Sequence, residues 1–325
     1  MHRFMSAALA FALAASAAHG AQSNSATGDY PNRPVRFIVA QSPGGNADFV
    51  ARLIAGELSK RFGQQFVVDN RGGGGGVLAV ELTVRAPANG YTLLLASSAF
   101  GTNPSLRKLS YDPLNDLAPI TLASNAPNIL VVNNALPVKS VKDLIALAKA
   151  KPGEINYGSS GIGGSTHLAG ELFDLMAGTK MIHVPYKGAA LALVEVMAGQ
   201  IQLSFASMPS VMSHVRSGKL RAVAVTSVKR SALVPDLPTI SESGLTGFET
   251  GAWQGIMAPR ATPPALVQLL NREIRTIVHL PEVKKQYAIE GGEPIGNSPE
   301  EFARFLRADI AKWAKVVKAA NFKVE

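Results

Sequence analysis

The sequence predicts an α/β protein with a mostly parallel sheet, and three observations lead to this fold class. Short apolar segments of strand length alternate with amphipathic segments of helix length almost throughout the chain, as in βαβ units. Several helical segments start at a capping residue directly after a turn of small residues. A length of 325 residues, with 47% hydrophobic and 17% charged residues, allows two domains with ample cores.

The first twenty residues have the composition of a secretory signal peptide. His2 and Arg3 precede an alanine-rich apolar run over residues 5–18, and Ala18-His19-Gly20 provides small residues at a cleavage site. The run is too short to span a membrane, and no later segment is apolar over the roughly 18 residues that a span needs. We therefore expect residues 1–20 to be removed, residues 21–30 to form a flexible lead-in, and the mature protein to be exported and soluble.

The charge and cysteine content narrow the classes of partner. No cysteine is present, which excludes disulfides, thiolate nucleophiles and cysteine metal sites. The formal net charge of +9, which falls by one when Arg3 leaves with the signal peptide, favours anionic partners. The Lys and Arg residues are scattered rather than clustered with aromatic residues, so we expect no nucleic-acid partner.

The first candidate binding site is a strand–turn–helix segment at residues 38–48. A buried strand leads into Pro43-Gly44-Gly45, and an amphipathic helix follows with Asn46 as its expected N-cap and Asp48 in its first turn. Glycines let a ligand approach the main chain, and the first N–H groups of a helix have no partner within it. The segment can therefore bind a small anion, or it can be only a tight turn between a strand and a helix.

The rest of the first domain continues with alternating elements. We expect strands at 65–68 and 91–96, a helix at 77–85 and a polar loop at 97–103. The five glycines at 72–76 match neither phosphate-binding nor dinucleotide-binding spacing, and we interpret them as a flexible or closely packed turn. The apolar segment 117–132 is predicted to be a strand that leaves one domain and enters another.

Two further turns of small residues are predicted in the second domain. We expect helices at 140–150 and after 188, and strands at 155–157, 181–186, 201–206 and 221–226, of which the last returns the chain to the first domain. The loop 158–166 leads into an amphipathic helix, and Lys187-Gly188 forms the other turn. In parallel sheets ligands bind at the carboxyl ends of the strands, where these loops would lie.

The C-terminal part of the chain is predicted to complete the first domain. A strand is expected at 253–258, a helix from Pro263 to His279, and a short helix from Pro281. Ser298 caps a long final helix with a continuous apolar stripe.

The titratable residues do not form a recognisable catalytic or metal-binding pattern. The histidines at 167, 183, 214 and 279 do not stand at metal-ligand spacing, and His183 lies in an apolar strand, where a core or rim role is expected. The serine loop lacks the Gly-x-Ser-x-Gly spacing. We therefore expect no metal, no cofactor and no enzymatic activity. The alternative is an exported hydrolase with a reactive serine in the loop 158–166.

Seven short motifs occur in order from about Tyr30 to the C-terminus. They are Pro43-Gly44-Gly45-x-x-Asp48, Asp69-Asn70-Arg71 followed by glycines, Gly90-Tyr91-Thr92-Leu93, Tyr186-Lys187-Gly188, Ser217-Gly218-Lys219-Leu220-Arg221-Ala222, Leu237-Pro238-Thr239-Ile240-Ser241-Glu242-Ser243-Gly244, and Trp253-Gln254-Gly255 leading to Ala258-Pro259. By this ordered set the chain resembles the Bug-type solute-binding proteins of tripartite tricarboxylate transporters.

The resemblance implies a periplasmic binding protein type II-like fold, with two Rossmann-like lobes and a ligand cleft between them. It implies a discontinuous first domain, 31–123 plus 227–325, with the second domain at 124–226. It also implies a periplasmic receptor that delivers a di- or tricarboxylate or an aromatic acid to inner-membrane tripartite transporter subunits, and we expect a monomer. A periplasmic sensor that presents a carboxylate to a signalling partner is the alternative.

In this family, small carboxylates are held by main-chain N–H groups, hydroxyls and ordered water from loops of both domains. The ligand-binding residues that we expect in this chain are Gln41, Ser42, Gly44, Gly45, Asn46, Ala47, Asp48, Ser97, Ser98, Ser159, Gly161, Gly164, Ser165, Thr166, His167, Lys187, Ala206 and Ser207.

The chain departs from the family pattern at four positions. Gln41 and Ser42 replace the apolar residue and proline that often precede Pro-Gly-Gly, and Gln202 and Ala206 stand where acids are common, at a strand expected to end in the cleft. The missing acid at 206 removes a partner for a ligand ammonium group. This change favours a ligand without a free amine, such as an aromatic or dicarboxylic acid, unless the substitutions are neutral drift.

Overall fold

The computed structural model describes residues 28–44, 46–186, 188–289 and 291–320. The predicted signal peptide, its cleavage site and most of the lead-in lie outside these residues, and so do Gly45 and Lys187. Among the helices in the described ranges, none has the length and apolar character that a membrane crossing requires.

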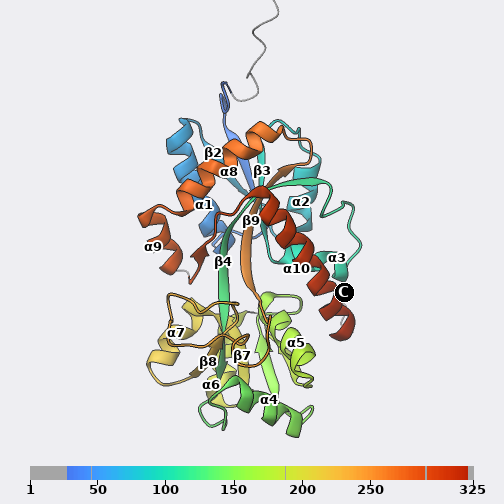
Figure 1. The fold of residues 1–325 in the computed structure, drawn as a ribbon, viewed down its shortest axis with the longest axis vertical. Helices are drawn as coiled ribbons and strands as arrows, with labels where there is room; N and C mark the ends of the chain where they lie inside the picture. The colour runs from blue at the N-terminus through green and yellow to red at the C-terminus, as the bar shows by residue number, and fades with distance from the viewer. Residues whose placement is uncertain (1–27, 45, 187, 290, 321–325) are drawn as a thin grey trace, which may run out of the picture.

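One half of the molecule is built on three parallel strands. β1 (Val35–Val39) pairs with β2 (Phe66–Asn70) on one side and with β3 (Thr92–Ser97) on the other. Around them lie η1 (Gly74–Gly76) and the helices α1 (Asn46–Phe62), α2 (Val77–Val84), α3 (Ala99–Leu106), α8 (Pro264–Val278), α9 (Pro281–Ile289) and α10 (Pro299–Ala320) (Figure 1).

The alternation of side chains along β1 divides the core of this half into two layers. Phe37 packs in a buried cluster with Ile54 of α1 and Ile274 of α8. The next residue, Ile38, lies in a second cluster with Val80 of α2 and Phe302 of α10. Both faces of β1 are therefore covered by helices, as expected for a parallel strand.

The other half repeats the same plan. β5 (Asn156–Ser159) pairs in parallel with β6 (Ile182–Pro185) and with β7 (Leu203–Ser207). Its helices are α4 (Val141–Ala150), α5 (Ser165–Ala177), α6 (Ala189–Ala198) and α7 (Met208–Arg216), and β8 (Arg221–Val225) completes it. The predicted cap of α4 is present, because the Ser140 side chain accepts a hydrogen bond from the Asp143 N–H group.

Long antiparallel strands connect the two halves, so the expectation of a mostly parallel sheet is wrong for its centre. β4 (Leu117–Val132) pairs with β9 (Gly251–Pro259) as far as Pro127, and from Asn128 onward it pairs with β7 and β8. The partners of β4, which include the short β10 (Glu293–Pro294), are antiparallel to it, and β9 is also antiparallel to β3. The chain crosses between halves here and returns, which reverses its direction (Figure 1).

The glycine run forms a closely packed turn, as one of the two predicted alternatives. Gly73 to Gly76 have positive φ angles between 57° and 95°, which favour glycine. A Cβ atom on Gly72 would lie 2.5 Å from Ser42 Oγ, and one on Gly76 would lie 2.8 Å from the Ala40 Cβ. The run therefore lets the chain after β2 pass directly beside the loop after β1.

The predicted polar loop at 97–103 is largely helical, which corrects the sequence interpretation. α3 begins at Ala99 and contains Phe100, Asn103 and Pro104. Its small and polar residues give it no clear apolar stripe, so periodicity did not indicate a helix. Phe100 and Asn103 are buried because α3 packs against α10 and against the glycine run.

The segment after β8 packs with the second half. Ile240, Leu245 and Phe248 share a buried cluster with Phe173 of α5, and the Phe173 and Phe248 ring centroids are 6.4 Å apart. Trp313 of α10 belongs to the same cluster. The predicted domain limits, with 124–226 as the second domain, stay a prediction.

Candidate functional site

The parallel strands of the two halves end opposite each other along β4. β3 ends at Ser97, which is level with Gln254 of β9 and hence with Ser124 of β4. β7 runs the other way and ends at Ser207, which is paired with Asn128. Ser124 and Asn128 are four residues apart, or about 13 Å along a strand at about 3.3 Å per residue. The loops that follow the parallel strands of each half therefore extend toward the other half.

In the first half, Asp48 holds the turn between β1 and α1. Its carboxylate is buried and accepts a hydrogen bond from the Gly44 N–H group at 2.9 Å. Arg52 donates to the same carboxylate at 3.0 Å. Burial alone would raise the pKa of Asp48, but the hydrogen bonds from Arg52 and Gly44 hold it below its ordinary value. The Gly44 N–H group, which we expected to bind a ligand, is thus already hydrogen-bonded to the Asp48 carboxylate.

The other residues predicted to bind a ligand in this half differ in their exposure and hydrogen bonding. Ser42 and Gly44 are exposed, and the Gln41 carbonyl accepts a hydrogen bond from Asn70 Nδ2 at 3.2 Å. Asn46 does not act as the expected N-cap, because its Oδ1 atom is buried without a hydrogen-bond partner. Ala47 is buried. Ser97 is buried at the end of β3, and Ser98 precedes α3 without a capping hydrogen bond.

In the second half, the loop 159–166 is fixed by its own polar side chains. Thr166 Oγ1 accepts a hydrogen bond from the Ser160 N–H group at 2.9 Å. Ser159 Oγ accepts one from the Gly161 N–H group at 3.1 Å, and His167 Nδ1 accepts one from the Gly163 N–H group at 3.0 Å. These hydrogen bonds therefore fix the conformation of the loop up to the start of α5. Ser165 and Thr166 are the first residues of that helix.

Two stacked histidines lie directly behind this loop. The His167 and His183 ring centroids are 3.8 Å apart, and the Tyr157 ring stacks on His183 at 5.0 Å. Glu171 accepts a hydrogen bond from the Tyr157 hydroxyl at 2.6 Å, and its Oε1 atom lies 3.3 Å from His167 Nε2. Burial, with a smaller contribution from His167, lowers the pKa of His183 to about 4. The expectation that His183 is a core or rim residue fits this position.

A serine–histidine pair is present in this cluster, but its geometry does not suit catalysis. Ser159 Oγ lies 2.6 Å from His183 Nε2, which resembles a nucleophile and its base. However, Ser159 has no exposed surface, and its hydroxyl also accepts the Gly161 N–H group. A substrate cannot reach an oxygen in that position. Among the residues that the structure describes, no cluster of three or more histidine and acidic side chains could hold a metal ion.

Successive side chains of β7 point to opposite faces of the sheet, so its predicted site residues differ in exposure. Ser207 is exposed at its carboxyl end, and its hydroxyl donates to Ser210 Oγ at 3.0 Å. Ala206 is fully buried in the core with Ile129. Gln202 precedes β7 at the opposite end from Ser207, where its Oε1 atom accepts the Asn156 N–H group at 2.8 Å. Gln202 is therefore remote from the end of β7 that points toward the other half.

Sequence reasoning missed a polar cluster where the chain crosses between the halves. Thr226 Oγ1 accepts the Asn128 N–H group and donates to the Thr250 carbonyl. Asn128 Nδ2, Ser227 Oγ and Thr250 Oγ1 are buried without hydrogen-bond partners. A polar residue within the apolar run 117–132 was the available signal. Buried unpartnered groups are uncommon in proteins, so this cluster is a candidate contact for a ligand or an ordered water.

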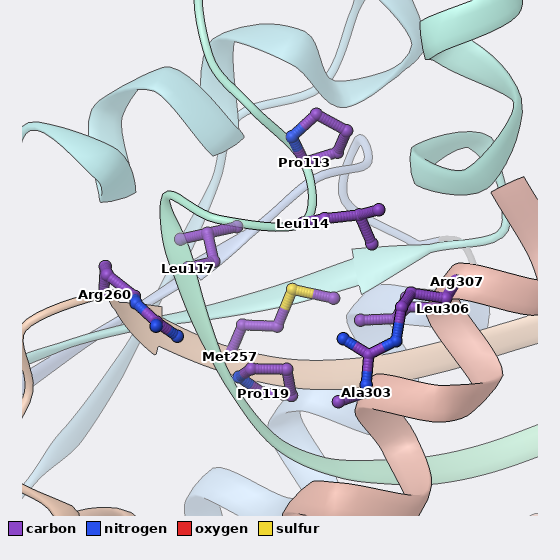
Figure 2. A pocket seen from close by; sticks show the side chains of 9 residues that line it. All are labelled: Pro113, Leu114, Leu117, Pro119, Met257, Arg260, Ala303, Leu306 and Arg307. Atoms are coloured by element: carbon purple, nitrogen blue, oxygen red, sulfur yellow. The ribbon is translucent and has the colours of Figure 1, made fainter.

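A small hollow lies elsewhere in the first half (Figure 2). It encloses about 70 Å³, and its lining comes from the start of β4 and its preceding segment, β9 and α10. Leu117, Met257 and Leu306 form apolar parts of the lining, with Arg260 and Arg307 beside them. None of the predicted site residues lines this hollow.

Two α/β halves on crossing strands, with the loops after their parallel strands extending toward each other, are the architecture of a two-lobed solute-binding receptor. Residues 50–322 match the model of the family described as "Tripartite tricarboxylate transporter family receptor". The chain belongs to this family, which confirms the resemblance found from the motifs.

One curated relative and two solved structures support the same assignment. Protein BugT of Bordetella pertussis is 38% identical over 91% of this chain and 92% of its own length. The structure titled "R. palustris Rpa4515 with adipate" is 38% identical, with a TM-score of 0.74 over 90% of this chain and 99% of that one. MatC (Rpa3494) from Rhodopseudomonas palustris, solved with bound malate, is 29% identical, with a TM-score of 0.70 over 89% of this chain and 100% of that one.

Proposed function

We propose that this receptor binds a small dicarboxylate between its two halves and delivers it to the subunits of an inner-membrane tripartite transporter. The observation that carries the proposal is that the loops after the parallel strands of each half, including those after β1 and β5, extend toward the other half in a chain of the transporter receptor family. The bound adipate and malate of two relatives, both dicarboxylates, make this chemical class the first to test. The exported, periplasmic location and the monomeric state belong to the same proposal.

The proposed contacts are the main-chain N–H groups at the starts of α1 and α5. Asn46 and Ala47 begin α1, and Ser165 and Thr166 begin α5, where helical N–H groups have no partner within the helix. Ser42 and Ser207 add exposed hydroxyls, and Asn128 adds an amide donor. We assign Ser159 and Asp48 a different role from the expected one, because both are buried and hold their loops in place.

These groups suffice for a useful affinity without a buried lysine. A helix start stabilises an anion by about 0.3–1 kcal/mol, or roughly 2 when it is partly buried. Each charge-assisted hydrogen bond adds about 1.5–3 kcal/mol. A few such contacts reach the roughly −8 kcal/mol of micromolar binding after the costs of ordering are subtracted. Contacts from both halves to one ligand would also favour their closure.

The ligand class is tested by thermal-shift screening of the purified mature protein. Adipate, malate, glutamate, aspartate and benzoate are added at the same ionic strength. A ligand present at about 100 times its dissociation constant stabilises the fold by roughly 2.7 kcal/mol. We expect a dicarboxylate without an amine to give the largest shift, because adipate and malate, the ligands of two relatives, are dicarboxylates without an amine. Tightest binding of glutamate or aspartate in calorimetry contradicts this choice.

The sensor alternative has the same fold and the same site, so only the partner distinguishes it. Ligand-loaded receptor is used to capture detergent-solubilised inner-membrane proteins, with ligand-free receptor as the control. Capture of transporter subunits supports delivery. Capture of a signalling protein in their place supports the sensor.

A further inference from the structure

A buried chain of side chains lies between the proposed anion-binding loop and the core of the second half. It consists of Tyr157 on β5, Ser159 at the end of β5, His167 and Glu171 on α5, and His183 on β6. We call this set the histidine network. Three of its members have 2% or less of their surface exposed, namely Tyr157, Ser159 and His167. Nothing in the proposed function requires stacked imidazole rings at this position.

The network ends on two separate amide groups of the loop. In one branch, His183 Nε2 lies 2.6 Å from Ser159 Oγ, and that oxygen accepts the Gly161 N–H group. In the other branch, Tyr157 and His167 meet at Glu171, and His167 Nδ1 accepts the Gly163 N–H group. The two branches meet in ring contacts, with 3.8 Å between the histidine centroids.

The contacts indicate the proton position on the His167 ring, since each hydrogen bond needs one donor. His167 Nδ1 must be unprotonated to accept the Gly163 N–H group, which leaves its proton on Nε2 beside Glu171. The Ser159 hydroxyl accepts the Gly161 N–H group and lies within donating distance, 3.2 Å, of the Gly161 carbonyl, so the tautomer of His183 decides whether Nε2 donates to Ser159 Oγ or accepts from it. His167 is therefore an acceptor toward the loop, and His183 is hydrogen-bonded to the Ser159 hydroxyl in either tautomer.

We propose that His183 is a positioning residue for carboxylate binding. Through Ser159 it fixes the Gly161 turn, and this turn sets the direction of the free N–H groups at the start of α5. This inference rests on the proposed function, because it concerns the same loop. It adds that the N–H groups at the start of α5 are oriented by His183 on β6, which need not contact the ligand.

The test replaces His183 by phenylalanine and by glutamine in the full mature chain. Phenylalanine keeps the ring stack but cannot form a hydrogen bond with the Ser159 hydroxyl. Glutamine can place a carbonyl oxygen near the former Nε2 position. His214→Phe on α7 is the matched control, because it removes an imidazole from the same half outside this network.

The first readout is amide hydrogen exchange without ligand. In His183→Phe we expect the Gly161 amide to exchange about tenfold faster, while Gly163 is unchanged because the Glu171 branch still holds it. His183→Gln should restore the protection of Gly161. Faster exchange of both amides together indicates general loosening and overturns the proposal, and so does unchanged exchange of Gly161.

The second readout is adipate affinity by calorimetry at neutral pH. Loss of one hydrogen bond of about 1.4 kcal/mol corresponds to about tenfold weaker binding, which we expect for His183→Phe. We expect His183→Gln and His214→Phe to bind within about threefold of wild type. Equal affinity of wild type and His183→Phe overturns the positioning role. If wild type itself does not bind adipate, the proposed ligand class fails, while the exchange of Gly161 still tests the network.

Discussion

His183 makes the stability of the fold sensitive to mild acid. Burial and the neighbouring His167 lower the pKa of His183 from 6.5 to about 4, although Glu171 acts in the opposite direction. Above pH 6.5 the ring is neutral in both the folded and the unfolded chain. As the pH falls from 6.5 to 4, the unfolded chain binds a proton that the folded chain does not bind. The free energy of unfolding therefore decreases over this window.

The size of this loss follows from the two pKa values. Their difference, 6.5 − 4 = 2.5, corresponds to about 3.4 kcal/mol at about 1.36 kcal/mol per unit. The ring is only half-buried, and solvent screening reduces the expected loss to about 2 kcal/mol. Urea unfolding of wild type and His183→Phe is compared at about pH 7.5 and about pH 4.5. Wild type should lose about 2 kcal/mol more than the variant, whereas equal losses would refute the reasoning.

Three further predictions concern the loops and the crossing strands. Asp48→Ala should lower the free energy of unfolding by about 1–2 kcal/mol in urea titrations at neutral pH, because the Gly44 N–H group and Arg52 lose their acceptor; no change would contradict this. Gly170→Ala should lower it by about 1–3 kcal/mol, because a Cβ atom there meets the Tyr157 ring, and a melting temperature equal to wild type would argue against the packing described. Asn128→Ala should weaken adipate binding about tenfold in calorimetry yet cost less than about 1 kcal/mol of stability, since its Nδ2 atom has no partner in the fold; unchanged affinity would remove Asn128 from the site.

The sequence predicted the elements that are determined by residues close together in the chain. Ser140 caps α4 because its side chain reaches a neighbouring N–H group, and the glycine run forms a tight turn because its φ angles are positive. α3 was missed because its burial comes from α10 and from the glycine run, which are distant in sequence or carry no periodic signal. The antiparallel centre of the sheet was also missed, because alternating strands and helices do not show where the chain crosses between halves.

The sequence predicted which loops form the candidate site, but it did not predict the role of each residue within them. Ser159 and Asp48 were expected to face a ligand, and instead they hold the Gly161 and Gly44 N–H groups. Residues that are far apart in sequence decide these roles, as His183 does for Ser159. Asn128 stood out as a polar residue within an apolar strand, but this signal alone does not show that its side chain is left without a partner in the fold.

The central claim is that the amide groups at the starts of α1 and α5 bind one carboxylate ligand together. A crystal structure of the mature protein with adipate tests it most directly. We predict carboxylate oxygens within hydrogen-bonding distance of main-chain N–H groups in both 42–48 and 160–166. Adipate bound to one half alone, or in the hollow beside Arg260 and Arg307, would contradict the claim.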